Sequence, residues 1–240
     1  MASSEHSSKQ YDIDLDGLRT LVLAMGGLVE SQIRSALDAF TTGDSALADR
    51  VIRGDHEVDS YEISIDQDCA HVIARRQPTA GDLRMIMAIS KTVTDLERVG
   101  DEAEKIARMA KSIHASGRVP AERLPQIRHV ADTALNMLRQ ALDAFARLDA
   151  SAAATTVLAD ARIDSEFRAI LRQLITYMME DPRTISTALE VIWVAKAIER
   201  IGDHAKNMAE YVIYVVEGTD VRHSDYLEQE RDKASREETP

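Results

Sequence analysis

The chain has 240 residues and a formal net charge of −12, from 29 basic and 41 acidic residues. This balance argues against a nucleic-acid-binding protein, because such proteins neutralise phosphates with lysine and arginine. No segment approaches the roughly 20 apolar residues of a membrane helix, and the polar N-terminus lacks the apolar region of a secretory signal. The single cysteine, Cys69, has no partner for an internal disulfide. We therefore expect a cytoplasmic protein without membrane insertion.

Apolar residues recur at the three- and four-residue spacing of amphipathic helices, and aromatic residues make up only 4% of the chain. Turn and capping residues divide this pattern: Gly43 precedes the N-cap candidate Asp44, and Pro78 precedes Asp82. The pattern predicts six helices, at about residues 14–40, 44–77, 82–115, 122–148, 150–180 and 183–217.

Short connections make consecutive helices antiparallel, so the sequence predicts an all-α fold of two three-helix bundles, each running up, down and up. The best candidate for a break between them is the segment SGRVP at residues 116–120. The expected organisation is a disordered N-terminus, a first bundle, a second bundle and a flexible acidic tail, at residues 1–11, 12–115, 122–217 and 218–240.

The two halves resemble each other in sequence. The letters ALDAF occur at residues 36–40 and again at residues 141–145, an offset of 105. ERVGDEAEKIA, which begins at Glu97, matches ERIGDHAKNMA, which begins at Glu199, at an offset of 102. The offset changes near the turn that ends at Asp82, where an insertion is tolerated. A tandem duplication explains the pattern, so each half should have the same fold.

Each copy of this motif places a glycine, Gly100 or Gly202, in the interior of a helix. Such a glycine costs about 1 kcal/mol relative to alanine. Both glycines lie on the apolar side of their helix, among small alanine residues. We predict that another helix approaches closely at these points, and we assign the glycines no direct functional role.

Acidic pairs spaced four residues apart place both carboxylates on one helix face. The pairs are Asp55 with Asp59, Glu97 with Asp101, Asp160 with Asp164, and Glu199 with Asp203. In each half, the two acidic pairs lie at about equal numbers of residues before and after the antiparallel turn. They should therefore lie at the same height along the bundle. The same count places Glu62 level with Glu97.

Carboxylates brought together in this way repel one another unless they take up protons or bind cations. Oxygen-rich clusters suit Mg²⁺, Mn²⁺, Ca²⁺, iron, or Zn²⁺ with fewer ligands. We therefore predict two metal sites, with the ligands Asp55, Asp59, Glu62, Glu97 and Asp101 in the first half and Asp160, Asp164, Glu199 and Asp203 in the second. The neighbouring His56 and His204 are left outside this set.

Two alternatives remain open. In the first, the acidic faces are only solvated and are neutralised by Arg98 and Arg200, which leaves a structural helical adaptor without metal. Carboxylate clusters in helical bundles also form di-metal oxidases, but those use Glu-x-x-His, which does not occur in the chain. Phosphate-binding loops and nucleophile triads are also absent from the sequence. We predict that the chain is not an enzyme.

The doubled Glu-Arg-(Val/Ile)-Gly-Asp motif resembles the paired acidic motif of the PhoU family, accessory regulators of bacterial phosphate uptake. Asp82-Leu83-Arg84 and the residues 196–200 add to the likeness, which extends over about residues 15–216. The resemblance implies a cytoplasmic protein of two three-helix bundles with metal clusters on its surface. The ligands that it implies are Glu97, Asp101, Glu199 and Asp203, with Asp59 and Asp164 from the facing helices.

The resemblance also implies partners. They are the ATPase of the phosphate ABC transporter and the phosphate-sensing histidine kinase, through which the family damps phosphate import and starvation signalling. In one respect the sequence departs from the family: residues 102–105 read EAEK where the family tends towards His-Ala-x-Asn, as at residues 204–207. The two sites are therefore expected to differ in metal content or affinity. Because long helices leave apolar stripes, we also expect a homodimer.

Overall fold

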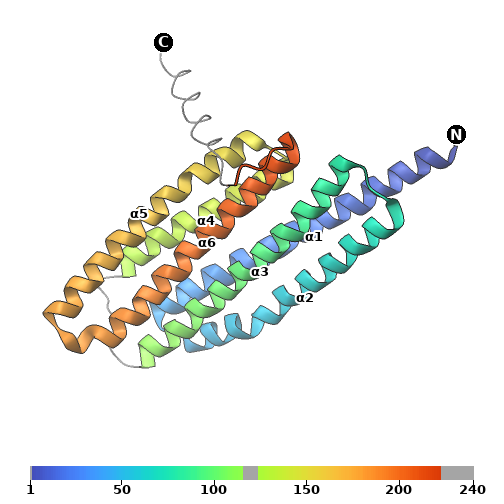
Figure 1. Cartoon of the computed structure of the whole chain (residues 1–240). Helices are drawn as coiled ribbons and strands as arrows, with labels where there is room; N and C mark the ends of the chain where they lie inside the picture. The colour runs from blue at the N-terminus through green and yellow to red at the C-terminus, as the bar shows by residue number, and fades with distance from the viewer. Residues whose placement is uncertain (1, 116–123, 223–240) are drawn as a thin grey trace, which may run out of the picture.

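The computed structural model describes residues 2–115 and 124–222, with side chains described over 11–115 and 125–222. The described part is built from helices and contains no strand. They are α1 (Ala2–Thr42), α2 (Ser45–Arg76), α3 (Ala80–Ala115), α4 (Leu124–Arg147), α5 (Ala150–Glu180), the short 3₁₀ helix η2 (Pro182–Thr184) and α6 (Ile185–Glu217). The first three form one up-down-up unit and the last three another (Figure 1). The predicted all-α fold of two three-helix bundles is confirmed.

Helices α2 and α5 begin after aspartate N-caps, whereas α3 begins at Ala80, two residues before the predicted start at Asp82. Asp44 accepts a hydrogen bond from the backbone N–H of Leu47 at 2.9 Å, and Asp149, 105 positions later, accepts one from Ala152 at 2.9 Å. The residue before each cap has a positive φ, +76° at Gly43 and +52° at the position before Asp149. The duplicated sequence thus forms the same turn twice.

The two ends of the chain differ from the expectation. Helix α1 begins at Ala2, so residues 2–11, which the sequence assigned to a disordered N-terminus, belong to a helix. This segment contains no proline or glycine that would end a helix. After α6, Val221 is only 1% exposed, so the start of the predicted flexible tail packs against the bundle. The predicted break at residues 116–120 and most of the tail lie outside the described residues.

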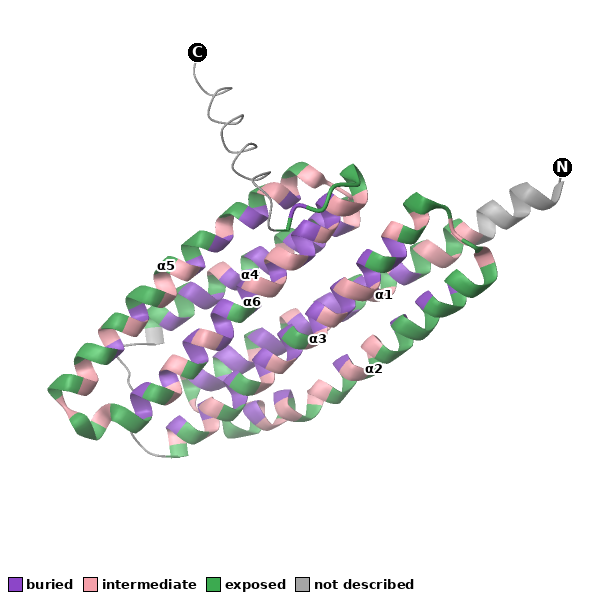
Figure 2. Cartoon of the chain, viewed as in Figure 1, coloured by how far each residue is buried: buried purple, intermediate pink, exposed green. Residues whose placement is uncertain are grey.

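The core does not divide between the two halves. Helix α3 packs against α6, and α1 packs against α4, while α2 and α5 contact only helices of their own half. Most buried residues accordingly lie along α1, α3, α4 and α6, while α2 and α5, at the two edges of the molecule, each bury one side (Figure 2). Each edge helix packs against both long helices of its own half, and the acidic pairs lie where α2 meets α3 and where α5 meets α6.

Candidate metal centre

Close helix packing at two glycines positions the acidic pairs. A Cβ added to Gly100 of α3 would lie 3.2 Å from Cγ1 of Val58 and 3.5 Å from Oδ1 of Asp55, both on α2. A Cβ added to Gly202 of α6 would lie 2.8 Å from Cδ1 of Ile163 on α5. The predicted close approach is therefore present in both halves. It brings the acidic face of each edge helix next to that of the central helix.

In the first half, the carboxylates of α2 and α3 influence one another. Burial, followed by the charges of Asp101 and Glu62, raises the pKa of Glu97 to about 7. Burial and the charges of Asp59 and Glu104 raise the pKa of Asp55 to about 6.

Two further acidic residues of this half, Glu62 and Asp101, are affected in the same way. Burial is also the main cause that raises the pKa values of Glu62 and Asp101. The structure therefore brings the five predicted acidic residues of the first half close enough to repel one another.

These five carboxylates have little compensation by basic side chains. Among the described residues, none of them forms an ion pair with a lysine or an arginine at 4.0 Å or less. Asp59 has Nδ1 of His56 at 3.7 Å, and Glu62 accepts a hydrogen bond from Thr94 at 3.3 Å. The first half thus presents an acidic surface without direct lysine or arginine partners, although Lys105 and Arg98 lie close enough to lower the pKa values of Asp101 and Glu62 in part.

The second half has a similar acidic set but carries its own cations. Burial and the charges of Glu199 and Asp160 raise the pKa of Asp203 to about 6. Lys206 Nζ, however, donates a hydrogen bond to Asp160 at 2.9 Å, and Lys196 donates one to Glu199.

A third acidic residue of the second half, Asp164, also has a basic partner. Arg168 pairs with Asp164 at 3.4 Å on α5. Three of the four predicted ligands of this half therefore have a basic partner.

The difference between the halves follows from the sequence. Lys206 and Lys196 stand where the first half has Glu104 and Thr94, 102 positions earlier. Phe167 stands 105 positions after Glu62, and the Lys196 ammonium lies 5.5 Å from the centre of its ring. Acidic or neutral residues of the first half have thus been replaced by basic or aromatic residues in the second.

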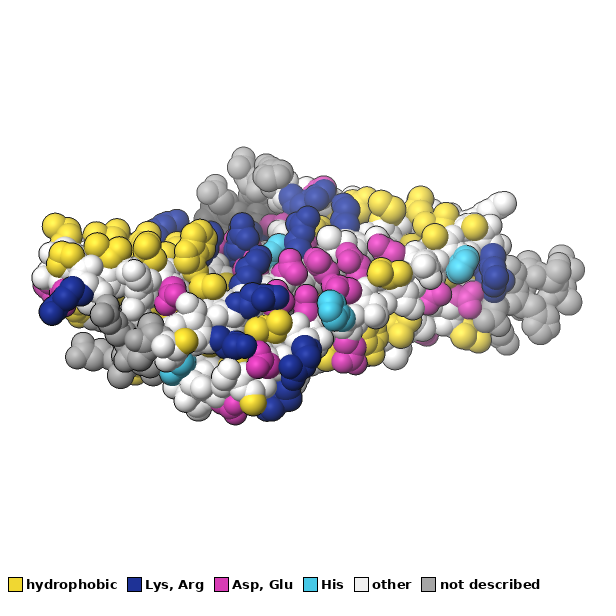
Figure 3. All heavy atoms as spheres, turned by 90° about the horizontal axis from the view of Figure 1, so that it is seen from below, with side chains coloured by type: hydrophobic (Ala, Val, Ile, Leu, Met, Phe, Trp, Pro, Cys, Tyr) yellow, Lys and Arg dark blue, Asp and Glu magenta, His cyan; other side chains and the backbone are white. Residues whose placement is uncertain are grey.

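Asp and Glu side chains, drawn in magenta, gather near the middle of the face shown in Figure 3. Within the described residues, however, no group of three or more His, Cys, Asp or Glu side chains is placed to hold a metal ion. A cation would be held only after carboxylate side chains such as Glu97 and Asp101 turn towards each other. The chemistry fits such a cation, because the donors are oxygens and a positive charge would relieve their repulsion.

Sequence reasoning missed a buried acidic residue between the halves. The side chain of Asp95 on α3 is 3% exposed, and its Oδ1 lies 2.7 Å from Nδ1 of His204 on α6. Asn207 Nδ2 donates to the same oxygen at 3.2 Å, and Tyr211 also hydrogen-bonds Asp95. His204 is thus engaged by a residue outside the acidic pairs. The only signal for Asp95 was a single carboxylate inside the apolar run of α3.

A second buried acidic residue, Glu102, binds the side chain of Arg200. Glu102 accepts hydrogen bonds from Lys105 at 2.9 Å and from Arg200 at 3.1 Å. In the adaptor alternative, Arg200 neutralises the acidic face of α6. In the structure it pairs instead with Glu102 of α3, across the two halves.

None of the described helices has both the length and the apolar character needed to span a membrane.

Comparison with known proteins identifies the family. The sequence matches the PhoU domain over residues 22–110 and again over residues 127–212. A phosphate-specific transport system accessory protein PhoU homolog of Pseudomonas putida is 50% identical over 220 residues, which cover 92% of this chain and 86% of that protein. The corresponding PhoU protein of Escherichia coli K12 is 44% identical over 220 residues, covering 92% of this chain and 90% of that protein.

Solved structures agree with these sequence matches. The crystal structure of PhoU from Pseudomonas aeruginosa has a TM-score of 0.84 and 47% identity, and the match covers 87% of this chain and 100% of that one. The phosphate transport system regulatory protein PhoU from Streptococcus pneumoniae gives 0.81 and 28% identity, with 88% and 99% covered. The names of these relatives describe accessory and regulatory proteins, not enzymes. Because the matches span both halves of the duplication, the chain belongs to the PhoU family.

Proposed function

We propose that this chain is a cytoplasmic, metal-binding regulator of phosphate uptake that acts by contacting other proteins and not by catalysis. The observation that carries the proposal is the acidic surface of the first half. There the pKa values of Glu97 and Asp55 are raised to about 7 and about 6, and no lysine or arginine of the described residues pairs with either carboxylate. A divalent cation would replace the missing positive charge and fix the shape of this surface.

The residues available to hold the metal are all oxygen donors. They are Asp55, Asp59, Glu62, Glu97 and Asp101 in the first half and Asp160, Asp164, Glu199 and Asp203 in the second. Such a set suits Mg²⁺, Mn²⁺ or iron, and Zn²⁺ with fewer ligands.

We expect the first half to bind metal more tightly than the second. In the second half a cation must displace Lys206 from Asp160 and Lys196 from Glu199 before it is coordinated. Breaking these two ion pairs costs free energy, which makes the net free energy of metal binding less favourable in the second half. The two sites would therefore fill at different metal concentrations.

The names of the relatives support the choice of partners. They are accessory proteins of the phosphate-specific transport system, so the transporter is the first partner to consider. We propose that the chain, as a homodimer, contacts the ATPase subunit of the phosphate ABC transporter and the phosphate-sensing histidine kinase. Holding both would damp phosphate import and phosphate-starvation signalling together. The metal would shape the acidic face that the partners recognise.

The second candidate function is a metal-free helical adaptor. The observation that favours it is the second half, where lysine and arginine already neutralise Asp160, Asp164 and Glu199. The adaptor would bind the same partners whether or not a metal is present. A di-metal oxidase has no comparable support, because the relatives are named as accessory proteins.

A pull-down with the transporter ATPase distinguishes the two candidates. We expect wild type to retain the ATPase in Mn²⁺, and we expect EDTA or the double variant Glu97→Ala/Asp101→Ala to reduce the retained amount at least about tenfold. The matched control is Asp12→Ala/Asp16→Ala, an exposed acidic pair of the same spacing on α1, which should behave as wild type. Undiminished binding in EDTA and by the first variant would support the adaptor and reject a functional metal.

A further inference from the structure

Basic side chains form a line along α3. We define them as the basic stripe, in which each member comes seven residues after the one before: Arg84, Lys91, Arg98 and Lys105. Seven residues make about two helical turns, so successive members lie about 10 Å apart on one face of the helix.

The basic stripe lies on the side of α3 that faces α6. The guanidinium carbon of Arg84 lies 3.8 Å from the position of a Cβ added to Gly218, directly after α6. The Lys91 ammonium lies 5.5 Å from the centre of the Tyr211 ring on α6. At the other end of the stripe, the Lys105 ammonium shares a carboxylate of α3 with an arginine of α6. The stripe therefore follows the seam between the two halves.

Most of the positive charge of the stripe has no acidic partner. Among the described residues, Arg84, Lys91 and Arg98 form no ion pair at 4.0 Å or less. Within the same part of the chain, the buried Nε atom of Arg84 has no hydrogen-bond partner. Lys105 pairs with Glu102, but this carboxylate also pairs with Arg200, so two cations meet one anion. The stripe can therefore accept further carboxylates.

The duplicated fold does not require the basic stripe. The equivalent positions on α6, 102 residues later, hold Ser186, Trp193, Arg200 and Asn207. Only one of these four side chains is basic. Because α6 packs in the same way without a line of cations, the stripe on α3 serves a contact and not the fold.

The segment that follows α6 already runs along the first interval of the stripe. It begins at Gly218, which lies beside Arg84. It reaches Arg222, whose guanidinium lies 5.9 Å from the centre of the same Tyr211 ring that Lys91 contacts. Val221 between these points is only 1% exposed, so the segment is anchored to the bundle.

An acidic residue accompanies this first interval. Hydrogen bonds from Arg222 are the main cause that lowers the pKa of Asp220 to about 2, and the charge of Lys91 adds to the effect. A carboxylate of the segment after α6 is thus already close to a member of the stripe.

The sequence that follows has the spacing needed to continue in this way. Residues 223–230, HSDYLEQE, contain three acidic residues and no lysine or arginine. Three residues of extended chain span about 10 Å, which is the spacing of the stripe. Asp225, three residues after Arg222, therefore comes to the level of Arg98. Three residues further on, Glu228 comes to the level of Lys105.

The attachment of this segment favours it over a separate acidic partner. It is joined to Arg222 beside the stripe, which gives its carboxylates a high effective concentration there. The nearest competing carboxylates are Glu62 and Asp101, whose pKa values Arg98 and Lys105 lower in part. Neither of these carboxylates forms an ion pair with the stripe at 4.0 Å or less.

We propose that residues 223–230 fold back along the basic stripe of their own chain, with Asp225 beside Arg98 and Glu228 beside Lys105. They cover the seam between the two halves, so an acidic segment of another protein reaches the stripe only by displacing them. This makes the segment an autoinhibitory contact. The proposal goes beyond the proposed function and does not depend on it, because neither the stripe nor the segment contains a candidate metal ligand.

Carbodiimide crosslinking of the full-length protein tests the proposal, because this reagent joins a lysine to a carboxylate only where the two are in direct contact. At low ionic strength, mass spectrometry should find a crosslink between Lys105 and Glu228. Lys206 and Asp160, whose charged atoms lie 2.9 Å apart, provide the internal positive control. In a mixture of chains labelled with light and heavy nitrogen, each crosslinked product should carry a single isotope.

Two results of this experiment would overturn the proposal. The first is a crosslink between Lys206 and Asp160 without any crosslink from residues 223–230 to Lys91 or Lys105. The second is a product in which residues 223–230 are joined to the stripe of another chain.

Charge reversal locates the contact on the stripe. Arg98→Glu should lower the yield of the crosslink between Lys105 and Glu228 at least about threefold. Arg172→Glu is the matched control, since Arg172 is an exposed arginine of α5 without an ion pair among the described residues, and it should leave the yield unchanged. The double variant Arg98→Glu/Asp225→Arg should restore the yield, and circular dichroism should show all variants folded. Equal yields in the two single variants, or no recovery in the double variant, would contradict this placement.

Discussion

At the scale of single residues, Gly202 shows how closely α5 and α6 pack. A Cβ there would lie 2.8 Å from Cδ1 of Ile163, so Gly202→Ala forces this buried side chain to move within a packed contact. The gain of about 1 kcal/mol in helix propensity offsets only part of an overpacking cost of about 1–3 kcal/mol. We expect Gly202→Ala to lower the free energy of unfolding by up to about 2 kcal/mol, as measured by urea denaturation.

Gly27 of α1 is the matched control, because it lies inside a helix and a Cβ there would meet nothing within 4 Å. Gly27→Ala should raise the free energy of unfolding by up to about 1 kcal/mol. If Gly202→Ala were as stable as Gly27→Ala, the close approach between α5 and α6 would not be needed for packing.

Asp95 joins the two halves through buried hydrogen bonds to His204 and Asn207. Asp95→Ala leaves these groups without their acceptor, so it should lower the free energy of unfolding by about 3–5 kcal/mol. Asp16→Ala removes an exposed carboxylate that pairs with Arg19 at 3.4 Å and should change stability by less than about 0.5 kcal/mol. Thermal unfolding of both variants tests the contrast, and equal effects would show that Asp95 is not a structural link.

Sequence reasoning identified some of these residues and not others for a physical reason. The glycines and the acidic pairs carry a local signature, which is their spacing along one helix and its repetition in the other half. The buried roles of Asp95 and Glu102 depend on how α3 meets α6, a contact between segments about 100 residues apart. Helical periodicity describes each helix alone and contains no information about that contact.

At the scale of the helices, the acidic face of each α2–α3 or α5–α6 pair makes stability depend on pH. Asp and Glu titrate near pH 4 in an unfolded chain, whereas the pKa of Glu97 is about 7 and those of Asp55 and Asp203 are about 6 in the folded protein. Between these values the folded state binds more protons than the unfolded state. The free energy of unfolding therefore falls as pH rises from about 4 to 7.

We expect the metal-free protein to melt at a higher temperature at pH 5 than at pH 8. Because these carboxyl groups are partly exposed to solvent, the difference should be only about 1–2 kcal/mol, or roughly 3–6 °C. Glu97→Gln should reduce the difference, since it removes the group with the highest raised pKa among the acidic pairs. Differential scanning calorimetry at the two pH values measures it, and a protein more stable at pH 8 would contradict the mutual repulsion.

The helices themselves were largely predictable, because their ends coincide with strong local signals such as Asp44, Asp149 and the proline at position 182. The start of α1 was not, because the polar residues 2–11 contain neither an apolar stripe nor a helix breaker. The lysines that compensate the second acidic set are visible in the sequence. Their partners are not, since Lys206 reaches Asp160 on a different helix.

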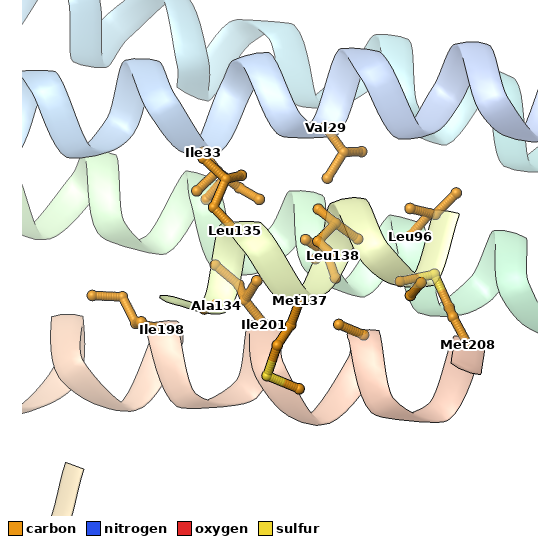
Figure 4. Close-up of a cluster of buried hydrophobic side chains, with 14 of the residues drawn as sticks. Val29, Ile33, Leu96, Ala134, Leu135, Met137, Leu138, Ile198, Ile201 and Met208 are labelled. Atoms are coloured by element: carbon orange, nitrogen blue, oxygen red, sulfur yellow. The ribbon is translucent and has the colours of Figure 1, made fainter. Parts of the chain in front are cut away.

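At the scale of the whole molecule, the two halves share one core. Leu138 of α4 lies in a buried cluster with Val29 and Ile33 of α1, Leu96 of α3 and Ile201 of α6 (Figure 4). The sequence predicted two bundles, but the repeat alone did not show that they pack into a single unit. We conclude that neither half is expected to unfold by itself.

The shared core predicts one cooperative unfolding transition. Leu138→Ala should lower the free energy of unfolding of the entire chain by about 2–5 kcal/mol and shift that single transition to lower temperature. The calorimetric and van't Hoff enthalpies should agree in both proteins. Two separate transitions, of which Leu138→Ala moves only one, would show that the halves unfold independently.

Equilibrium dialysis against Mn²⁺ with elemental analysis tests the central claim, that the carboxylates of the two halves bind metal and that the first half binds more tightly. Wild type should retain metal in two steps, the variant Glu97→Gln/Asp101→Asn should lose the tighter step, and Glu199→Gln/Asp203→Asn should lose only the weaker one. No retained metal, or the same retention by all three proteins, would contradict the claim.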